Sequence, residues 1–353
     1  MPNFSKLEER IKQAVKSFDI NKILFALFCS FCTILYLFIR QDNFTFDNLK
    51  KIKNINVIYL ILSILMLVVR DFIYTYRIKL LADKSLSWSK CLVIIILWEF
   101  LSTITPGAVG GGAVAFIFFV KEDIPLVQAL AYIMVTSTFD NYFFAINGPF
   151  GFHYAYDIIA KRGGVILFFI IYFGVLLYAS VMTFTLFIKP DLLNYIVLKI
   201  IKKTPFRKYT DTIKKYVEEI VKSSHILRKR GKIFWLKILC ITLLAWWSRY
   251  IILNFIIASF FPTCTLWQHI EILCKHLAMW ITMLVSPMPG GAGTTEYVFC
   301  SLYNDFLKDY IPIVLLIWRF LTYYIYLFVG IIVFYFWFKD FKNKYNKIYK
   351  KDI

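Results

Sequence analysis

Six ionisable side chains interrupt long apolar stretches of this sequence. They are Arg70, Glu99, Asp140, Arg249, Glu296 and Arg319. A charged side chain at the centre of a membrane helix costs about 2.5–3.5 kcal/mol, so each of them needs a partner or a wet cavity. A guanidinium can grip a phosphate group through two hydrogen bonds, and a carboxylate can hold an amine or a proton. Buried ion pairs that only fix the register of the helices use the same residue types, and both interpretations stay open.

Two clusters of proline and glycine break apolar segments that would otherwise be helical. The first cluster contains Thr105, Pro106, Gly107, Gly110 and Gly111, and the second contains Pro287, Pro289, Gly290, Gly291 and Gly293. Glycine permits sharp turns and the close approach of a ligand or another backbone, and N–H groups at helix ends attract anions such as phosphate. Close packing of short helices through small residues is the alternative. The two interpretations can hold together.

Composition indicates what kind of fold must position these residues. Hydrophobic residues make up 59% of the 353 positions and charged residues 18%, whereas soluble domains are nearer half apolar and a quarter charged. Several apolar runs reach the roughly 20 residues that cross a bilayer. The sequence therefore predicts an all-α integral membrane protein, a polytopic helical bundle. Membrane spans are expected at about 21–39, 57–76, 126–147, 163–188, 233–260 and 311–338.

One transmembrane domain, residues 21–340, is predicted between two short flanking segments. Residues 1–20 have the pattern of an amphipathic interfacial helix, and residues 341–353 form a basic tail. The formal net charge of +19 gathers in such segments and in a long polar loop at 189–232. This pattern is typical of the cytoplasmic loops of membrane proteins. We therefore expect a multi-pass protein of the inner or plasma membrane with both termini in the cytoplasm, and no nucleic-acid partner.

Each segment that ends at a Pro-Gly cluster is followed by a piece too short to span. The first pair of segments is 86–105 and 108–120, and the second pair is 268–286 and 296–306. We expect each pair to form a re-entrant helical hairpin that dips into the membrane and returns to the same side. With both termini in the cytoplasm, the first hairpin enters from the cytoplasm and the second enters from outside.

The two halves of the chain repeat one order of features. Repeat 1 covers about 57–188 and repeat 2 about 233–338. In each, an intramembrane arginine (Arg70 or Arg249) precedes the Pro-Gly break, and a charged residue follows on the next span. Matched features in opposite orientation are the signature of an inverted-topology repeat, and broken segments in the two halves of such transporters point to the binding site.

Patterns typical of metal, redox or nucleotide sites are weak here. Cys29 and Cys32 have the spacing of a redox pair, but they lie among Leu and Phe with no second pair, so packing is the simpler reading. His269 and His276 form a poor metal set by themselves. No nucleotide-binding motif is present. We expect no cofactor, no metal and no catalytic residue.

The broken segments carry a resemblance to a known family. Pro287–Glu296 reads Pro-x-Pro-Gly-Gly-x-Gly-x-x-Glu, with Arg319 on the next span, and Thr105–Gly112 precedes Asp140 in the same way. In these features the chain, over about 20–340, resembles the lysylphosphatidylglycerol synthase transmembrane-region family, also called the flippase-like domain family. The first motif departs from the family's usual Gly-Gly-x-Gly-Gly-like run.

The resemblance implies lipid handling. In the multiple peptide resistance factors, this domain is associated with moving aminoacylated phosphatidylglycerol to the outer leaflet, and a separate C-terminal domain transfers the lysine. This chain stops at Ile353, so we expect no lysyltransferase activity. Other stand-alone members of the family are linked to polyprenyl-phosphate sugars.

Three functions fit the sequence. The leading one is a lipid translocase for (lysyl-)phosphatidylglycerol or a polyprenyl-phosphate-linked lipid, with membrane lipids as partners. The second is a scaffold for a lipid-modifying enzyme, which would bind that enzyme through the 189–232 loop. A homo-oligomer is the other partnership that we expect. A secondary transporter of a small solute is the third. A membrane enzyme would need a clustered base or metal site, which the sequence does not suggest.

Overall fold

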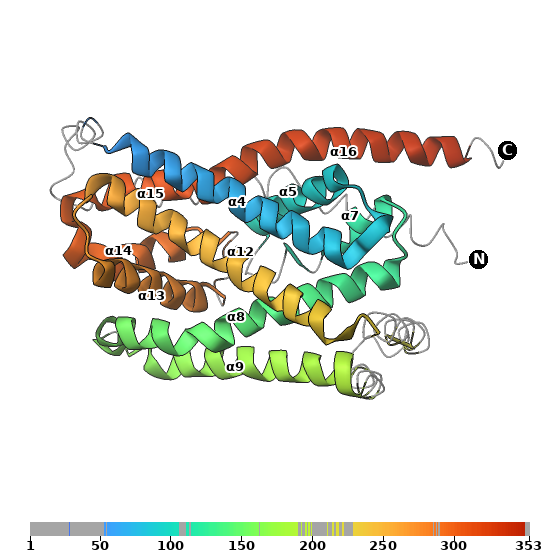
Figure 1. The fold of residues 1–353 in the computed structure, drawn as a ribbon, viewed down its shortest axis with the longest axis horizontal. Coiled ribbons are helices and arrows are strands. Elements are labelled where there is room, and N and C mark those ends of the chain that lie inside the picture. Colours follow the sequence, from blue (N-terminus) through green and yellow to red (C-terminus); the bar gives the residue numbers. More distant parts are fainter. Residues whose placement is uncertain are drawn as a thin grey trace.

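Helices make up the described part of the chain. The computed structural model describes residues 55–105, 114–161, 163–189, 229–284 and 290–349, together with isolated positions outside these ranges. Within them no strand occurs, and the helices form an elongated bundle (Figure 1). The prediction of an all-helical protein is confirmed over these residues. The predicted segments 1–20 and 21–39, and most of the 189–232 loop, lie outside the described residues.

Four helical stretches are long and apolar enough to cross a membrane. They are Val57–Ser85, Val165–Thr183, Gly231–Phe260 and Thr294–Phe341. Large apolar side chains on these helices face outward: α9 (Val165–Thr183) exposes Ile170, Phe173 and Leu177. Exposed apolar surface of this extent is costly in water but matches the acyl chains of a bilayer. The exterior therefore fits a membrane protein.

Two antiparallel helices, α4 (Val57–Ala82) and α12 (Gly231–Phe260), pack along each other through the bundle. The backbone N–H of Asn56 donates to the carbonyl oxygen of Ser259 at 2.8 Å. At the other end of the pair, the Arg230 guanidinium donates to a backbone carbonyl near the end of α4 at 2.7 Å. The start of each helix therefore lies against the end of the other.

Helices α5 (Trp88–Ile104) and α13 (Leu266–Met283) enter the bundle from opposite ends. The side chain of Ser87 caps α5, and Thr265 begins α13 in a capping box; both side chains satisfy N–H groups that lack helical partners. α5 follows α4 and α13 follows α12 in the chain. Because α4 and α12 are antiparallel, α5 and α13 start at opposite ends of that pair.

The chain turns back after each of these two helices. α7 (Phe116–Lys121) follows α5, and α14 (Thr294–Leu307) follows α13. Figure 1 shows α5 and α7 toward one end of the bundle and α13 and α14 toward the other. The turning segments touch, because the N–H of Gly290 donates to the carbonyl oxygen of Thr105 at 3.2 Å. Backbone from the two halves therefore meets inside the bundle.

Helix α8 (Leu126–Lys161) is longer than the sequence predicted. We predicted a span at 126–147 and a loop after Gly148, but the helix continues through Pro149 to Lys161. Gly148 lies against the ring of Tyr172 on α9, and Gly151 lies against the backbone of Ala278 on α13. The missing side chains let α8 pack closely on both neighbours, and this packing outweighs the helix-breaking tendency of Gly-Pro.

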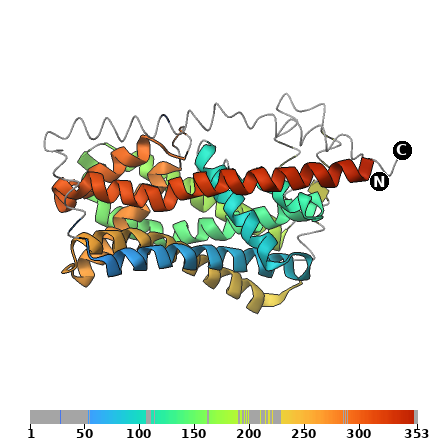
Figure 2. The same ribbon diagram turned by 90° about the horizontal axis from the view of Figure 1, so that it is seen from above.

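The last helical stretch consists of α15 (Ile311–Arg319), a π-helical turn (Phe320–Tyr324) and α16 (Ile325–Tyr349). It passes the predicted end of the span at 338, and as a whole it runs along the length of the bundle in Figure 2. A second π-helical turn, Phe184–Ile188, follows α9. Short π turns often mark functional sites, because they shift the register of the side chains that follow.

Candidate functional site

A cavity of about 420 Å³ lies where the two turning segments meet. Its size falls within the range of about 300–1,000 Å³ that is typical of small-molecule sites. Both halves of the chain contribute to its wall. Six of the predicted site residues line it: Glu99, Asp140, Arg249, Gly290, Gly291 and Arg319.

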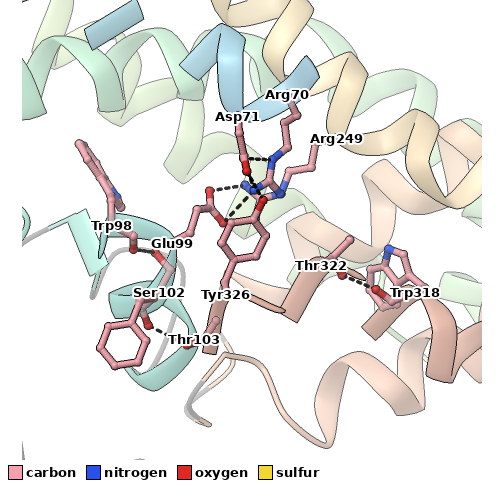
Figure 3. Close-up of polar contacts among 11 residues, drawn as sticks. Arg70, Asp71, Trp98, Glu99, Ser102, Thr103, Arg249, Trp318, Thr322 and Tyr326 are labelled. Atoms are coloured by element: carbon pink, nitrogen blue, oxygen red, sulfur yellow. Dashed lines mark hydrogen bonds and ion pairs between the residues drawn. The ribbon is translucent and has the colours of Figure 1, made fainter. Parts of the chain in front are cut away.

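Glu99 on α5 connects the two halves at this cavity. Its carboxylate accepts hydrogen bonds from both terminal nitrogens of Arg249 on α12, at 3.1 and 2.9 Å (Figure 3). This two-point geometry is the strong form of an ion pair. A second guanidinium lies behind it, with Nη2 of Arg70 3.8 Å from Oε2 of Glu99. Arg249 is 24% exposed and lines the cavity, whereas Arg70 is fully buried.

Asp71 completes this cluster. Nε and Nη2 of Arg70 donate to one oxygen of Asp71 at 3.1 and 2.8 Å, and the hydroxyl of Tyr326 donates to the other at 2.6 Å. The Arg70 guanidinium also lies 4.6 Å from the centre of the Tyr326 ring. The sequence analysis did not include Asp71 or Tyr326 among the site residues. The structure instead joins them to Arg70 from α4 and α16 (Figure 3).

Asp140 on α8 pairs with Arg77, which the sequence analysis missed. Nη1 and Nη2 of Arg77 donate to the two oxygens of Asp140 at 2.5 and 3.4 Å, and the indole N–H of Trp246 donates to Asp140 at 2.7 Å. The predicted span ended at residue 76, whereas α4 continues to Ala82. Arg77 lies seven residues after Arg70, which puts both on one face of a helix, and that spacing was the available signal.

Glu296 and Arg319 form the most buried pair of the site. Nε of Arg319 donates to Oε1 of Glu296 at 2.7 Å, and the backbone N–H of Gly293 donates to Oε2 at 2.7 Å. The Glu296 side chain is 0% exposed and the Arg319 side chain is 4% exposed. Glu296 therefore does two things: it caps the start of α14, and it holds the Arg319 side chain at the cavity wall.

The glycines of the broken segments act through close contacts. A Cβ on Gly111 would collide with Ser102 of α5, and one on Gly290 would lie 2.8 Å from the carbonyl oxygen of Thr103. Gly290, Gly291 and Gly293 have φ of +56°, +68° and +83°, which side chains disfavour. Five predicted residues lie outside the described residues: Pro106, Gly107, Gly110, Pro287 and Pro289.

A comparison with protein-family models identifies the family. The model of the lysylphosphatidylglycerol synthase TM region matches residues 10–330, which include both broken segments and the four arginines of the site. The chain belongs to this family. No curated protein and no solved structure matches the chain. No C-terminal synthase domain is detected in these 353 residues. The lysylphosphatidylglycerol synthase TM family supports a membrane domain related to lipid modification or flippase function.

Charges at the site of this lysylphosphatidylglycerol synthase TM domain balance within the described residues. Each arginine lies against a carboxylate, and the four ion pairs involve different acids: Arg70–Asp71, Arg77–Asp140, Arg249–Glu99 and Arg319–Glu296. Paired charges avoid much of the cost of burial. The site therefore offers both signs of charge to a ligand rather than a cationic surface alone.

Aromatic side chains form much of the remaining wall in this family member. Phe144 stacks on Trp280 with ring centres 3.8 Å apart, and Trp246 meets Trp280 edge to face. His276 also lines the cavity, beside Tyr250. No group of three or more His, Cys, Asp or Glu in the described residues could hold a metal ion. The predicted pair Cys29 and Cys32 lies outside the described residues.

Asp140→Asn is expected to destabilise the protein by about 1–2 kcal/mol. The change removes one charge from a hydrogen-bonded pair and leaves Arg77 without a carboxylate, although the 21% exposure of Asp140 lets water compensate in part. The thermal unfolding of purified protein in detergent measures the loss. Arg77→Met in the Asp140→Asn background removes the unpaired charge and should restore part of the lost stability. If Asp140→Asn unfolded at the same temperature as the native protein, this prediction would be wrong.

Proposed function

We propose that the protein is a lipid translocase, which moves a phospholipid such as (lysyl-)phosphatidylglycerol or a polyprenyl-phosphate-linked lipid between leaflets. The observation that carries this proposal is the cavity inside an apolar bundle, lined by ionised groups from both halves of the chain. Charged residues at membrane depth are expensive and usually mark the path of a polar substrate. The family match supports lipid as the substrate class.

The arrangement of helices supports an inverted-topology repeat with two re-entrant hairpins. α4 and α12 carry the matched arginines Arg70 and Arg249 and are antiparallel. The helices that follow them, α5 and α13, start at opposite ends and break where Thr105 meets Gly290. In transporters of this kind, rocking of one repeat against the other exposes a central site to each side in turn.

The composition of the cavity wall supports entry from the side. Tyr178 of α9 lines the cavity and is 37% exposed, and its hydroxyl hydrogen-bonds with Ser137 of α8. On the same helix Phe173 and Leu177 face outward. A headgroup could thus pass between polar rim residues while its acyl chains stay along the apolar surface. The apolar surface beside the rim favours a lipid, because a solute that lacks acyl chains would not contact it.

The chemistry of the wall fits a headgroup with phosphate. Arg249 and Arg319 reach the cavity from α12 and α15, and each can bind a phosphate oxygen. Glu99 and Asp140 lie on the opposing helices α5 and α8 and can hold an amine of the headgroup or a proton. In this proposal the protein is a multi-pass protein of the cell membrane, with both termini in the cytoplasm beside the basic segments.

Leaflet exchange in liposomes tests the proposal. Purified protein is reconstituted with trace fluorescent phosphatidylglycerol, lysyl-phosphatidylglycerol or a polyprenyl-phosphate sugar, and a membrane-impermeant quencher reports exposure. We expect exchange of one lipid to accelerate with native protein and to fall by about 100-fold in Arg249→Met, because a buried charge-assisted contact to phosphate is lost. Quenching kinetics give both rates.

Arg230→Met is the matched control, since Arg230 is an arginine at the start of α12 that does not line the cavity. It should exchange lipid at the native rate. No acceleration of any of the three lipids by well-folded protein would overturn the translocase. A scaffold for a lipid-modifying enzyme, or a transporter of small solutes, would then be the better account.

A further inference from the structure

Two arginines share one carboxylate at the cavity. Glu99 makes two hydrogen bonds to Arg249, while Nη2 of Arg70 lies 3.8 Å from Oε2 of Glu99. Arg70 already gives Nε and Nη2 to Asp71. Its third nitrogen, Nη1, is buried and has no hydrogen-bond partner among the described residues. Figure 3 shows the three side chains converging from α4, α5 and α12.

An unpartnered donor on a fully buried guanidinium is unfavourable. It shows that Asp71 does not use all the hydrogen-bonding capacity of Arg70. Nη2 of Arg70 carries two N–H groups, and it makes one hydrogen bond to Asp71. Hydrogen-bond distance is about 2.9 Å, so a shift of about 1 Å would bring Oε2 of Glu99 from 3.8 Å to bonding distance of this Nη2. The side chain that would gain a free face by this shift is Arg249, which is the arginine of the cluster that lines the cavity.

A phosphate group that reaches Arg249 cannot coexist with Glu99 at the same guanidinium edge, because both are anions. If Glu99 left Arg249 with no other partner, it would become an unpaired charge in a site where it is only 13% exposed. Arg70 removes this cost. Arg70 is fully buried and does not line the cavity, and Asp71 and Tyr326 hold it in place.

We propose that a phosphate group entering the cavity displaces Glu99 from Arg249, and that Glu99 then pairs with Arg70. Arg249 contacts the phosphate, and Arg70 is a positioning residue that never does. The inference rests on the proposed function for the class of ligand. The phosphodiester of a lipid and free phosphate present the same oxygens to Arg249, so the chemistry is shared by both sources.

Lipid binding to purified protein in a neutral detergent tests whether Glu99 changes partner from Arg249 to Arg70. Phosphatidylglycerol is titrated, and bound lipid is counted by native mass spectrometry. Glu99→Gln removes the competing charge, so we expect about tenfold tighter binding. Arg70→Lys keeps the positive charge, but an ammonium lacks the planar fork that serves two carboxylates at once. We expect about tenfold weaker binding in Arg70→Lys, because Glu99 stays on Arg249.

The double variant distinguishes exchange from simple charge effects. In the Glu99→Gln background, Arg70→Lys should have no effect on binding, since no carboxylate needs to move. A charge effect alone would leave Arg70→Lys neutral in both backgrounds. Arg70→Gln is a second variant, and it should likewise weaken binding only when Glu99 is present. Equal effects in the two backgrounds, or weaker binding in Glu99→Gln, would overturn the proposal. Arg230→Lys is the control and should bind as the native protein does.

Competition separates the two sources of phosphate. If inorganic phosphate displaces phosphatidylglycerol with the same dependence on Arg70 and Glu99, phosphate itself is sufficient to make Glu99 change partner. If inorganic phosphate does not compete, only the phosphate of a lipid headgroup makes Glu99 change partner. This binding assay is also independent of transport. If the expected binding pattern appears but no lipid moves between leaflets, the change of partner by Glu99 is upheld and the translocase is overturned. If lipid moves between leaflets but the binding pattern is absent, the translocase is upheld and the change of partner is overturned.

Discussion

Glu296→Gln is expected to destabilise the protein by about 3–5 kcal/mol, because it leaves the buried Arg319 guanidinium without its ion-pair partner. The two side chains are 0% and 4% exposed, so water cannot replace the lost charge. Glutamine has nearly the same size, and its amide oxygen can still accept the N–H of Gly293, so the cap of α14 is kept. The midpoint of thermal unfolding in detergent, compared with native protein, measures the change.

Two further variants make this result specific. Arg319→Met in the Glu296→Gln background removes the orphaned charge, and we expect the double variant to be more stable than Glu296→Gln alone. Glu218→Gln is the matched surface control, because Glu218 pairs with Lys214 where both are about half exposed. It should change stability by about 0.5 kcal/mol or less. A Glu296→Gln protein as stable as this control would refute the role of the buried pair.

Gly290→Ala is expected to destabilise the protein by about 3 kcal/mol, from backbone strain and overpacking together. Gly290 has a φ of +56°, and its new Cβ would lie 2.8 Å from the carbonyl oxygen of Thr103 and would also collide with the ring of Tyr323. The change therefore pushes apart the two turning segments at the point where Gly290 contacts Thr105. Thermal unfolding in detergent gives the loss.

Gly174→Ala is the matched control for this substitution. Gly174 lies within α9, and a Cβ there meets nothing within 4 Å. Alanine has the higher helix propensity, so the control should leave stability unchanged or raise it by up to about 1 kcal/mol. If Gly290→Ala and Gly174→Ala unfolded at the same temperature, close contact at Gly290 would not be what holds the two segments together.

The sequence indicated which charges need partners but not which partners they have. The cost of burial singled out three arginines and three acids, and the breaks in the apolar segments added the glycines. Pairing is a different matter, because Glu99 meets Arg249 across 150 positions of the chain. That contact depends on how α5 packs on α4 and how α4 packs along α12. Helical spacing carries information only about the faces of one helix.

Residues missed by the sequence analysis share a physical cause. Arg77 was lost because the predicted span stopped at residue 76, and boundaries are the least certain part of such predictions. Trp246 and Tyr326 look like members of an aromatic belt, since nothing in one sequence shows that their polar atoms reach Asp140 and Asp71. Pro149 indicated a helix end, but the packing of the neighbouring glycines decided otherwise.

The balance of charges at the cavity has an electrical consequence. The four arginines and the four carboxylates of the described ion pairs cancel, so a rearrangement that carries them together moves no net charge along the membrane normal. In the proposed translocase, the membrane voltage would then act on the charge of the lipid alone, at about 2.3 kcal/mol per elementary charge for each 100 mV. A singly anionic lipid would be driven by voltage in one direction, whereas a zwitterionic lipid would cross at a rate that voltage leaves unchanged.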